Sequence, residues 1–225
     1  MDLTAFDNAL RERPLVAILR GIETREIDAV ADELIEAGIR LIEVPLNSPT
    51  PWESIERLVE RAPADVAVGA GTVLTVDDVD RLAACGATLM VTPNTDIDVV
   101  SAAARHGLGS LIGVATASEA FAAIKHGARG LKLFPAGRLG PGYLKDLKSV
   151  LPVGQPIMAV GGINHHVMAE WHVAGVNGFG FGSNLYTPGK AAREVGETAR
   201  ELVNEWVRLE EQMSQIEGLY HEFDQ

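Results

Sequence analysis

The feature that most constrains the fold is an alternation, repeated eight times, between a short apolar run and an amphipathic helical pattern. The apolar runs are short and rich in Val, Ile, Leu and Phe, and they are bounded by turn residues, which predicts strands. We expect these strands at residues 15–19, 41–44, 66–70, 88–91, 110–113, 130–134, 157–160 and 178–181. Strict strand–helix alternation predicts a parallel sheet. Eight units of about 25 residues predict one closed (β/α)8 TIM barrel rather than an open doubly wound sheet.

The segments between these strands have the pattern of amphipathic helices. We expect helices at residues 24–37, 51–61, 75–85, 97–106, 118–126, 141–150, 165–173 and 190–209. Thr24 and Thr75 are of the residue type that caps helix N-termini, and most of the predicted helices stop at a glycine. An extra N-terminal helix, at residues 3–11, is expected to cover the barrel floor. Residues 1–225 thus form a single domain, with the barrel at about 14–206 and an irregular acidic C-terminal tail at 207–225.

Composition limits the classes of function. With 47% hydrophobic residues the chain can bury a substantial core. A net charge of −12 argues against binding to nucleic acid or to an anionic membrane surface, so any anion site must be built locally. Cys85 is the single cysteine, and the histidines show no metal-ligand pattern, so we expect neither a disulfide nor a metal. The first thirteen residues lack a signal peptide's apolar centre, and we therefore expect a cytoplasmic protein.

One predicted strand carries a lysine. Alternation puts Lys132 and Phe134 on one face of this strand, and Leu131 and Leu133 on the other. A lysine held in an apolar interior has a lowered pKa, and its neutral amine is then a nucleophile towards a ketone. The alternative is that only the side-chain stem packs while the ammonium group reaches water.

Active sites of such barrels form at the carboxyl ends of the strands, where further polar residues of this chain fall. Glu43 is, like Lys132, an ionisable residue inside an apolar strand, and a carboxylate beside an amine supplies a general acid and base. Glycines follow the last two strands, where they allow backbone N–H groups to approach a phosphate. The strand-end candidates are Arg20, Thr72, Thr92, Pro93, Asn94, Thr116, Gly161, Gly162, Gly182 and Ser183. For a strand-end threonine the alternative is a helix cap, and for the glycines a tight turn.

These motifs resemble those of the Schiff-base-forming aldolases of 2-keto-3-deoxy-6-phosphosugar acids, over residues 14–206. The resemblance is carried by residues 17–21, 43–49, 69–73, 91–94, 113–116, 131–135, 160–162 and 182–183.

The resemblance implies a class I aldolase (a lyase of carbohydrate metabolism) that needs no cofactor and cleaves a phosphorylated keto-deoxy sugar acid to pyruvate and D-glyceraldehyde 3-phosphate. Lys132 would form the Schiff base, and Glu43 would shuttle protons. Arg20 and Thr72 would hold the pyruvate-half carboxylate. The resemblance also implies a homotrimer. It further implies that the remaining substrate-binding residues would be Thr92, Pro93, Phe134, Gly161, Gly162, Gly182 and Ser183.

Two branches of the family differ at a few positions. Asn47 stands where the gluconate branch carries an arginine, and Val160 stands where that branch carries a threonine. Arg20 is typical of the galactonate branch, which this chain resembles more. An enzyme of the gluconate branch, or one that acts on both epimers, is the alternative. Two other readings are a phosphate-binding isomerase or epimerase with an electrostatic Lys132, and a catalytically silent sugar-phosphate-binding protein.

Overall fold

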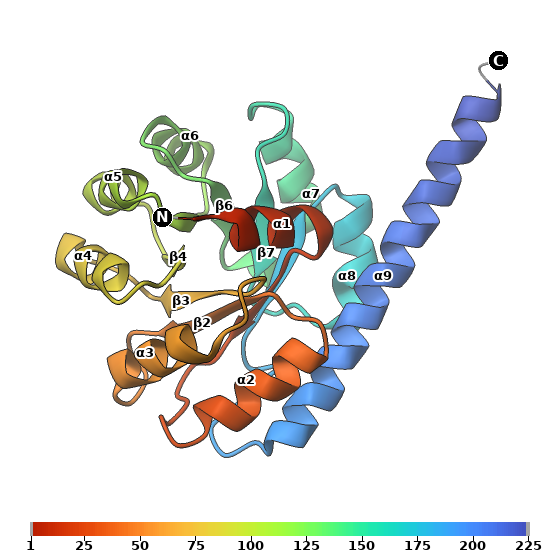
Figure 1. Cartoon of the computed structure of the whole chain (residues 1–225). Coiled ribbons are helices and arrows are strands. Elements are labelled where there is room, and N and C mark those ends of the chain that lie inside the picture. The colour runs from red at the N-terminus through yellow and green to blue at the C-terminus, as the bar shows by residue number, and fades with distance from the viewer. Residues whose placement is uncertain (1, 224–225) are drawn as a thin grey trace.

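The computed structural model describes the backbone of residues 2–223 and the side chains of residues 2–215. Eight parallel strands form a closed barrel in chain order, with the helices around it (Figure 1), which confirms the predicted (β/α)8 architecture. The strands are β1 Leu15–Ile18, β2 Leu41–Pro45, β3 Ala67–Gly71, β4 Leu89–Val91, β5 Gly109–Val114, β6 Gly130–Leu133, β7 Ile157–Val160 and β8 Gly178–Phe181. The helices are α1 Thr4–Glu12, α2 Ile27–Glu36, α3 Pro51–Arg61, α4 Val76–Ala84, α5 Ile97–His106, α6 Ala117–Lys125, α7 Ala136–Lys148, α8 His165–Val173 and α9 Ala192–Phe223.

Two helices begin three or more residues away from the start that the sequence pattern predicts. Helix α2 starts three residues later than expected, at Ile27, because the hydroxyl of Thr24 bonds with Thr50 and Ser54 instead of capping the helix. Helix α7 starts five residues earlier than expected, at Ala136, and accommodates Pro141 through a kink at Gly140, where φ is 85°. The cap expected at Thr75 is present, since its side chain accepts a hydrogen bond from the backbone N–H of Asp78.

The C-terminal segment is a helix as far as Phe223, which corrects the expectation of an irregular tail from residue 207; residues 224–225 of that expected tail lie outside the described residues. Helix α9 packs against α2 and α8 and continues to Phe223, so that its last turns extend beyond the barrel (Figure 1). Residues 207–217 contain neither proline nor glycine, and seven of these eleven residues are Glu, Gln, Leu or Arg, which favour helix. Helical propensity over this stretch outweighs its acidic charge. No helix in residues 2–223 is long and apolar enough to cross a membrane.

Side chains of the strands alternate between two packing regions. Outward-pointing side chains such as Leu131 and Leu133 pack under the helices in the larger apolar cluster. Inward-pointing side chains form a second cluster inside the barrel: Val16, Ile18, Leu41, Ala67, Leu89, Val91, Leu111, Met158 and Val160. Phe6 of α1 joins this inner cluster from below and is fully buried, so α1 closes the barrel floor as expected.

Candidate active site

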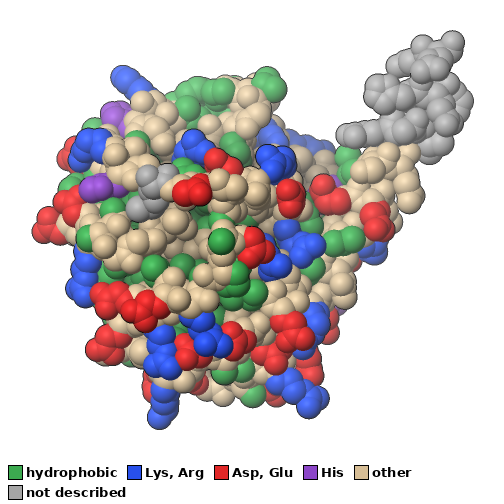
Figure 2. Space-filling view, viewed as in Figure 1, with side chains coloured by type: hydrophobic (Ala, Val, Ile, Leu, Met, Phe, Trp, Pro, Cys, Tyr) green, Lys and Arg blue, Asp and Glu red, His purple; other side chains and the backbone are tan. Residues whose placement is uncertain are grey.

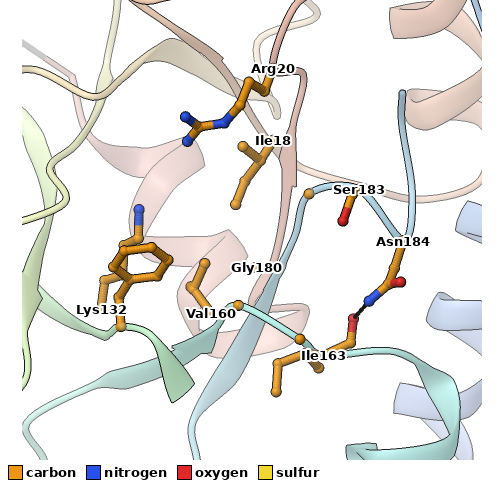
Figure 3. Close-up of a pocket in the computed structure, with 12 residues that line it drawn as sticks. Ile18, Arg20, Lys132, Val160, Ile163, Gly180, Ser183 and Asn184 are labelled. Atoms are coloured by element: carbon orange, nitrogen blue, oxygen red, sulfur yellow. Dashed lines mark hydrogen bonds between the residues drawn. The ribbon is translucent and has the colours of Figure 1, made fainter. Parts of the chain in front are cut away.

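A cavity of about 260 Å³ opens at the carboxyl end of the barrel (Figure 3). Its walls come from the ends of β1, β6, β7 and β8 and from the loops that follow them. The lining residues are Ile18, Arg20, Lys132, Phe134, Val160, Gly161, Gly162, Ile163, Gly180, Gly182, Ser183 and Asn184. Seven of the predicted site residues therefore lie together, although they are far apart in the sequence.

Lys132 brings a buried amine to this cavity. Its side chain stands on the inward face of β6, its residue is 5% exposed, and its Nζ lies 5.1 Å from the centroid of the Phe134 ring. Removal from water lowers the pKa of Lys132; Glu43 opposes this shift, and Arg20 adds to it. The amine points into the cavity (Figure 3), and at 5% exposure it does not extend into bulk water. The local environment therefore favours the neutral, nucleophilic amine.

Glu43 lies inside the barrel on β2 and is 1% exposed. Burial raises the pKa of Glu43 to about 7, against the opposing effects of Lys132 and Arg20. Its Oε2 has no hydrogen-bond partner among the described residues. Space for the carboxylate comes from Gly71 on β3, because a Cβ at that position would lie 1.9 Å from Oε2. A carboxyl group with a pKa near neutrality can both give and take a proton at physiological pH.

Arg20 follows β1 and is exposed at the mouth of the cavity. Its charge affects the pKa of both Lys132 and Glu43, so its guanidinium lies near both groups. In Figure 3 the guanidinium and the Lys132 amine occupy one side of the cavity, and Ser183 lies across from them. The cavity therefore has a cationic end.

The opposite end is built from backbone. Gly161 and Gly162 both have left-handed conformations, with φ of 97° and 80°. The backbone N–H of Gly137 donates to the carbonyl oxygen of Gly161 at 2.8 Å, which holds this turn against α7. The side chain of Asn184 donates to the carbonyl oxygen of Ile163 at 2.7 Å and so joins the loops after β7 and β8 (Figure 3). Such glycine-rich turns suit an anion, because their N–H groups can converge on it.

Four predicted site residues are not among those that line the cavity: Glu43, described above, and Thr72, Thr92 and Pro93. The hydroxyl of Thr92 donates to the carbonyl oxygen of Asn94 at 2.7 Å and accepts from the N–H of Gly113 at 3.0 Å, so it joins the loop after β4 to strand β5. The backbone of Pro93 lies against Gly113 of β5. Thr72 has φ of 55°, a left-handed conformation that threonine rarely adopts. Contacts of Thr72, Thr92 and Pro93 with a substrate remain predictions.

Some site residues were not expected from the sequence. The sequence pattern assigns no role to Ile18, Ile163, Gly180 and Asn184, which line the cavity. Strand alternation carries a signal for Ile18, which lies two residues before Arg20 and shares its face. Thr116 has the alternative role of a cap, since its hydroxyl accepts from the N–H of Glu119. Within the described residues no group of three His, Cys, Asp or Glu is placed to hold a metal ion.

Comparison with known proteins places this site in a family. The model of the KDPG and KHG aldolase family matches residues 6–194. The probable 2-dehydro-3-deoxy-6-phosphogalactonate aldolase of Rhizobium meliloti (strain 1021) is 48% identical over 84% of this chain and 89% of the relative. The 2-dehydro-3-deoxy-6-phosphogalactonate aldolase of Escherichia coli (strain K12) is 43% identical over 84% of this chain and 93% of the relative.

A solved structure described as native KDPGal is 40% identical and superimposes with a TM-score of 0.87, covering 89% of this chain and 97% of that one. The buried Lys132 of this cavity and the buried Glu43 thus occur in a chain that matches aldolases over most of its length. The chain belongs to the KDPG and KHG aldolase family and is a lyase.

Proposed function

We propose that this chain is a class I aldolase that cleaves 2-dehydro-3-deoxy-6-phosphogalactonate reversibly to pyruvate and D-glyceraldehyde 3-phosphate. The observation that carries the proposal is Lys132: it is 5% exposed and lines the cavity, and burial lowers its pKa. The names of the two curated relatives supply the substrate, and their coverage of 89% and 93% supports carrying it over.

The reaction begins with attack of the neutral Lys132 amine on the C2 ketone, which gives a carbinolamine. Glu43 in its protonated form donates a proton to the C2 hydroxyl, which leaves as water, and an iminium forms. Glu43 is then a carboxylate and takes the proton of the C4 hydroxyl as the C3–C4 bond breaks. The bonding electrons move into the iminium, glyceraldehyde 3-phosphate leaves, and an enamine remains. Protonation at C3 and hydrolysis release pyruvate and restore the amine.

This mechanism needs no cofactor, because the iminium nitrogen itself accepts the electron pair. In our proposal the substrate carboxylate faces Arg20, at the cationic end of the cavity, and the phosphate lies on the glycine turns at Gly161-Gly162 and Gly182-Ser183. The planar guanidinium can hold a carboxylate through two parallel hydrogen bonds. Following the family resemblance, Thr72, Thr92, Pro93 and Phe134 are the remaining proposed contacts.

Two measurements test the proposal. Borohydride added with pyruvate should reduce the iminium and leave a stable adduct on Lys132, located by peptide mass spectrometry. An active enzyme with the adduct elsewhere, or with none, would contradict the mechanism and favour an electrostatic Lys132 in an isomerase. Cleavage assays with the galactonate and gluconate substrates side by side test the stereochemical preference. Equal kcat/KM values would replace our assignment with an aldolase for both epimers.

We further propose that the enzyme acts in galactonate degradation as a homotrimer, as the family resemblance implies. The trimer is supported by three large apolar side chains that the single chain leaves about half exposed beside neighbouring helices: Leu74, Ile97 and Phe121, at 50%, 47% and 45% exposure. Light scattering coupled to size-exclusion chromatography should give three times the chain mass of 24.0 kDa. A monomer mass at working concentration would contradict the proposal.

A further inference from the structure

The Arg20 side chain is not held in place by polar contacts with the described residues. Arg20 is exposed, and among the described residues its guanidinium takes part in no ion pair and no hydrogen bond. A long side chain without partners has several rotamers available. Where its charge lies therefore depends first on the position of the backbone that carries it.

That backbone is held on both sides of Arg20 by the neighbouring strand and loop. The N–H of Leu19 donates to the carbonyl oxygen of Glu43 at 2.9 Å, which continues the pairing of β1 with β2. The N–H of Gly21 donates to the Oγ of Ser48 at 3.0 Å. Gly21 has φ of +81°, and a Cβ there would lie 2.8 Å from Pro188, so this backbone has little freedom to shift towards the loop after β8.

Ser48 is placed to act as a fixed anchor. It is 9% exposed, and its own N–H donates to the carbonyl oxygen of Pro45 at 2.9 Å, in the tight turn that follows β2. A second connection joins the same two loops, because the hydroxyl of Thr24 lies 2.9 Å from that of Thr50 and 3.0 Å from that of Ser54. The loop after β1 is thus attached to the end of the strand that carries Glu43.

We propose that Ser48 is a positioning residue, whose hydroxyl holds the Gly21 backbone and thereby keeps the Arg20 side chain within reach of the substrate carboxylate. This inference rests on the proposed function, in which Arg20 binds that carboxylate. Without the hydroxyl, the Gly21 N–H loses its acceptor and the loop can relax. A displacement of about 1 Å at a group that orients the substrate lowers catalysis by up to about 100-fold.

A matched pair of serine variants separates positioning from stability. Ser110 is also buried, at 1% exposure, and its Oγ accepts a backbone N–H, that of Arg129, at 3.1 Å. Ser110 begins β5 near the barrel floor, away from the cavity. We expect Ser48→Ala to lower kcat/KM for the phosphosugar acid about 10-fold and to raise KM for pyruvate in condensation. Ser110→Ala should leave both values within about 2-fold, and Ser48→Thr, which keeps the hydroxyl, should restore most of the activity.

A double-mutant cycle with Arg20→Ala shows whether Ser48 acts through Arg20. We expect Ser48→Ala to have little further effect once Arg20 is alanine. The pH profile provides a second readout: since Arg20 lowers the pKa of Lys132, whose neutral amine is the reactive form, Ser48→Ala should move the acidic limb to higher pH, as Arg20→Ala does.

Three outcomes would overturn the inference. Ser48→Ala could behave like Ser110→Ala, or its effect could multiply with that of Arg20→Ala. If Arg20→Ala alone kept full activity, the roles of both Arg20 and Ser48 would be refuted. In each case borohydride trapping on Lys132 reports separately whether the aldolase proposal stands.

Discussion

The two halves of the barrel interior are built by the same strand alternation but filled in opposite ways. At the amino end, apolar side chains such as Leu41 and Met158 pack against Phe6 of α1, and Phe6 is fully buried. At the carboxyl end, the next inward positions hold Glu43 and Lys132. Figure 2 shows charged side chains of both signs scattered over the face of the molecule in view, in contrast to this buried pair.

This difference between the two ends separates the residues that stabilise the fold from those that carry the chemistry. Burial of apolar side chains at the floor contributes to the free energy of folding at about 25 cal/mol per Å² removed from water. Removal of Glu43 and Lys132 from water opposes folding, and the pKa of each group shifts towards its neutral form. Substitutions at the floor should therefore change stability, whereas substitutions at the carboxyl end should change catalysis.

The largest effect is expected for Lys132→Met, which keeps a long side chain but removes the amine. We expect kcat to fall by at least about 10⁴-fold, since the covalent step is lost. The melting temperature should stay the same or rise, because a buried polar group is replaced by an apolar one. Pyruvate release and calorimetry measure the two effects. Activity within about 100-fold of the wild type would remove Lys132 from the covalent role.

Glu43→Gln should lower kcat by about 10² to 10⁴-fold, because the amide can neither give nor take the required proton. Trapping of pyruvate on Lys132 should persist at a reduced rate. Steady-state cleavage kinetics and timed borohydride quenching distinguish these effects. Near-normal turnover would return Glu43 to a structural role.

The same variant tests the pH dependence of stability. Because the pKa of Glu43 is about 7 in the folded chain and 4.5 in the reference state, the folded chain retains a proton that the unfolded chain releases between these values. The stabilising contribution of Glu43 to the wild-type free energy of unfolding is therefore fully present below pH 4.5 and is lost as pH rises to about 7. The loss is about 3 kcal/mol, at about 1.4 kcal/mol per pKa unit.

Glu43→Gln lacks this titration, so its stability relative to the wild type should increase across that pH range. Urea unfolding at about pH 5 and about pH 8 measures the difference. An unchanged difference at the two pH values would contradict the raised pKa of Glu43.

Substitution of one phenylalanine at each end of the barrel compares the floor with the carboxyl end directly. Phe6→Ala should destabilise the fold by about 3–5 kcal/mol, since it leaves a cavity in a closed apolar cluster, while kcat/KM at low temperature changes little. Phe134 is 36% exposed at the cavity, and Phe134→Ala should leave stability nearly unchanged while lowering kcat/KM. Chemical denaturation and kinetics on both variants provide the comparison. If Phe6→Ala mainly lowered kcat/KM and Phe134→Ala mainly lowered stability, the assignment of stability to the floor and catalysis to the carboxyl end would be refuted.

The smallest expected effect is that of Arg20→Lys, which keeps the positive charge but loses the planar guanidinium group with its two parallel N–H donors. We expect a loss of about 1–3 kcal/mol in transition-state binding, or about 5–150-fold in kcat/KM. Pyruvate condensation should suffer as well, since it shares the carboxylate. If pyruvate is spared and glyceraldehyde 3-phosphate binds more weakly, Arg20 serves the phosphate end, and the proposed orientation is reversed.

The sequence alone determined the architecture and the central pair of residues. All eight strands were found within two residues of their observed ends, because hydrophobic periodicity and glycine stops are local signals. The inward orientation of Lys132 and Glu43 followed from the two-residue period of a strand. In the C-terminal segment the reading was wrong: acidic composition favoured an irregular tail, whereas the helix-forming residues extend α9 to Phe223.

The tertiary structure decided how distant segments share the site. Contacts between different strands and loops build the site. They are the space that Gly71 leaves for Glu43, the hydrogen bond from Gly21 to Ser48, and the two hydrogen bonds of Thr92. No local period encodes such contacts, since they depend on strand register and loop packing around the closed barrel. For the same reason, the sequence could place a threonine at a strand end but could not say whether its hydroxyl faces a substrate or its own backbone.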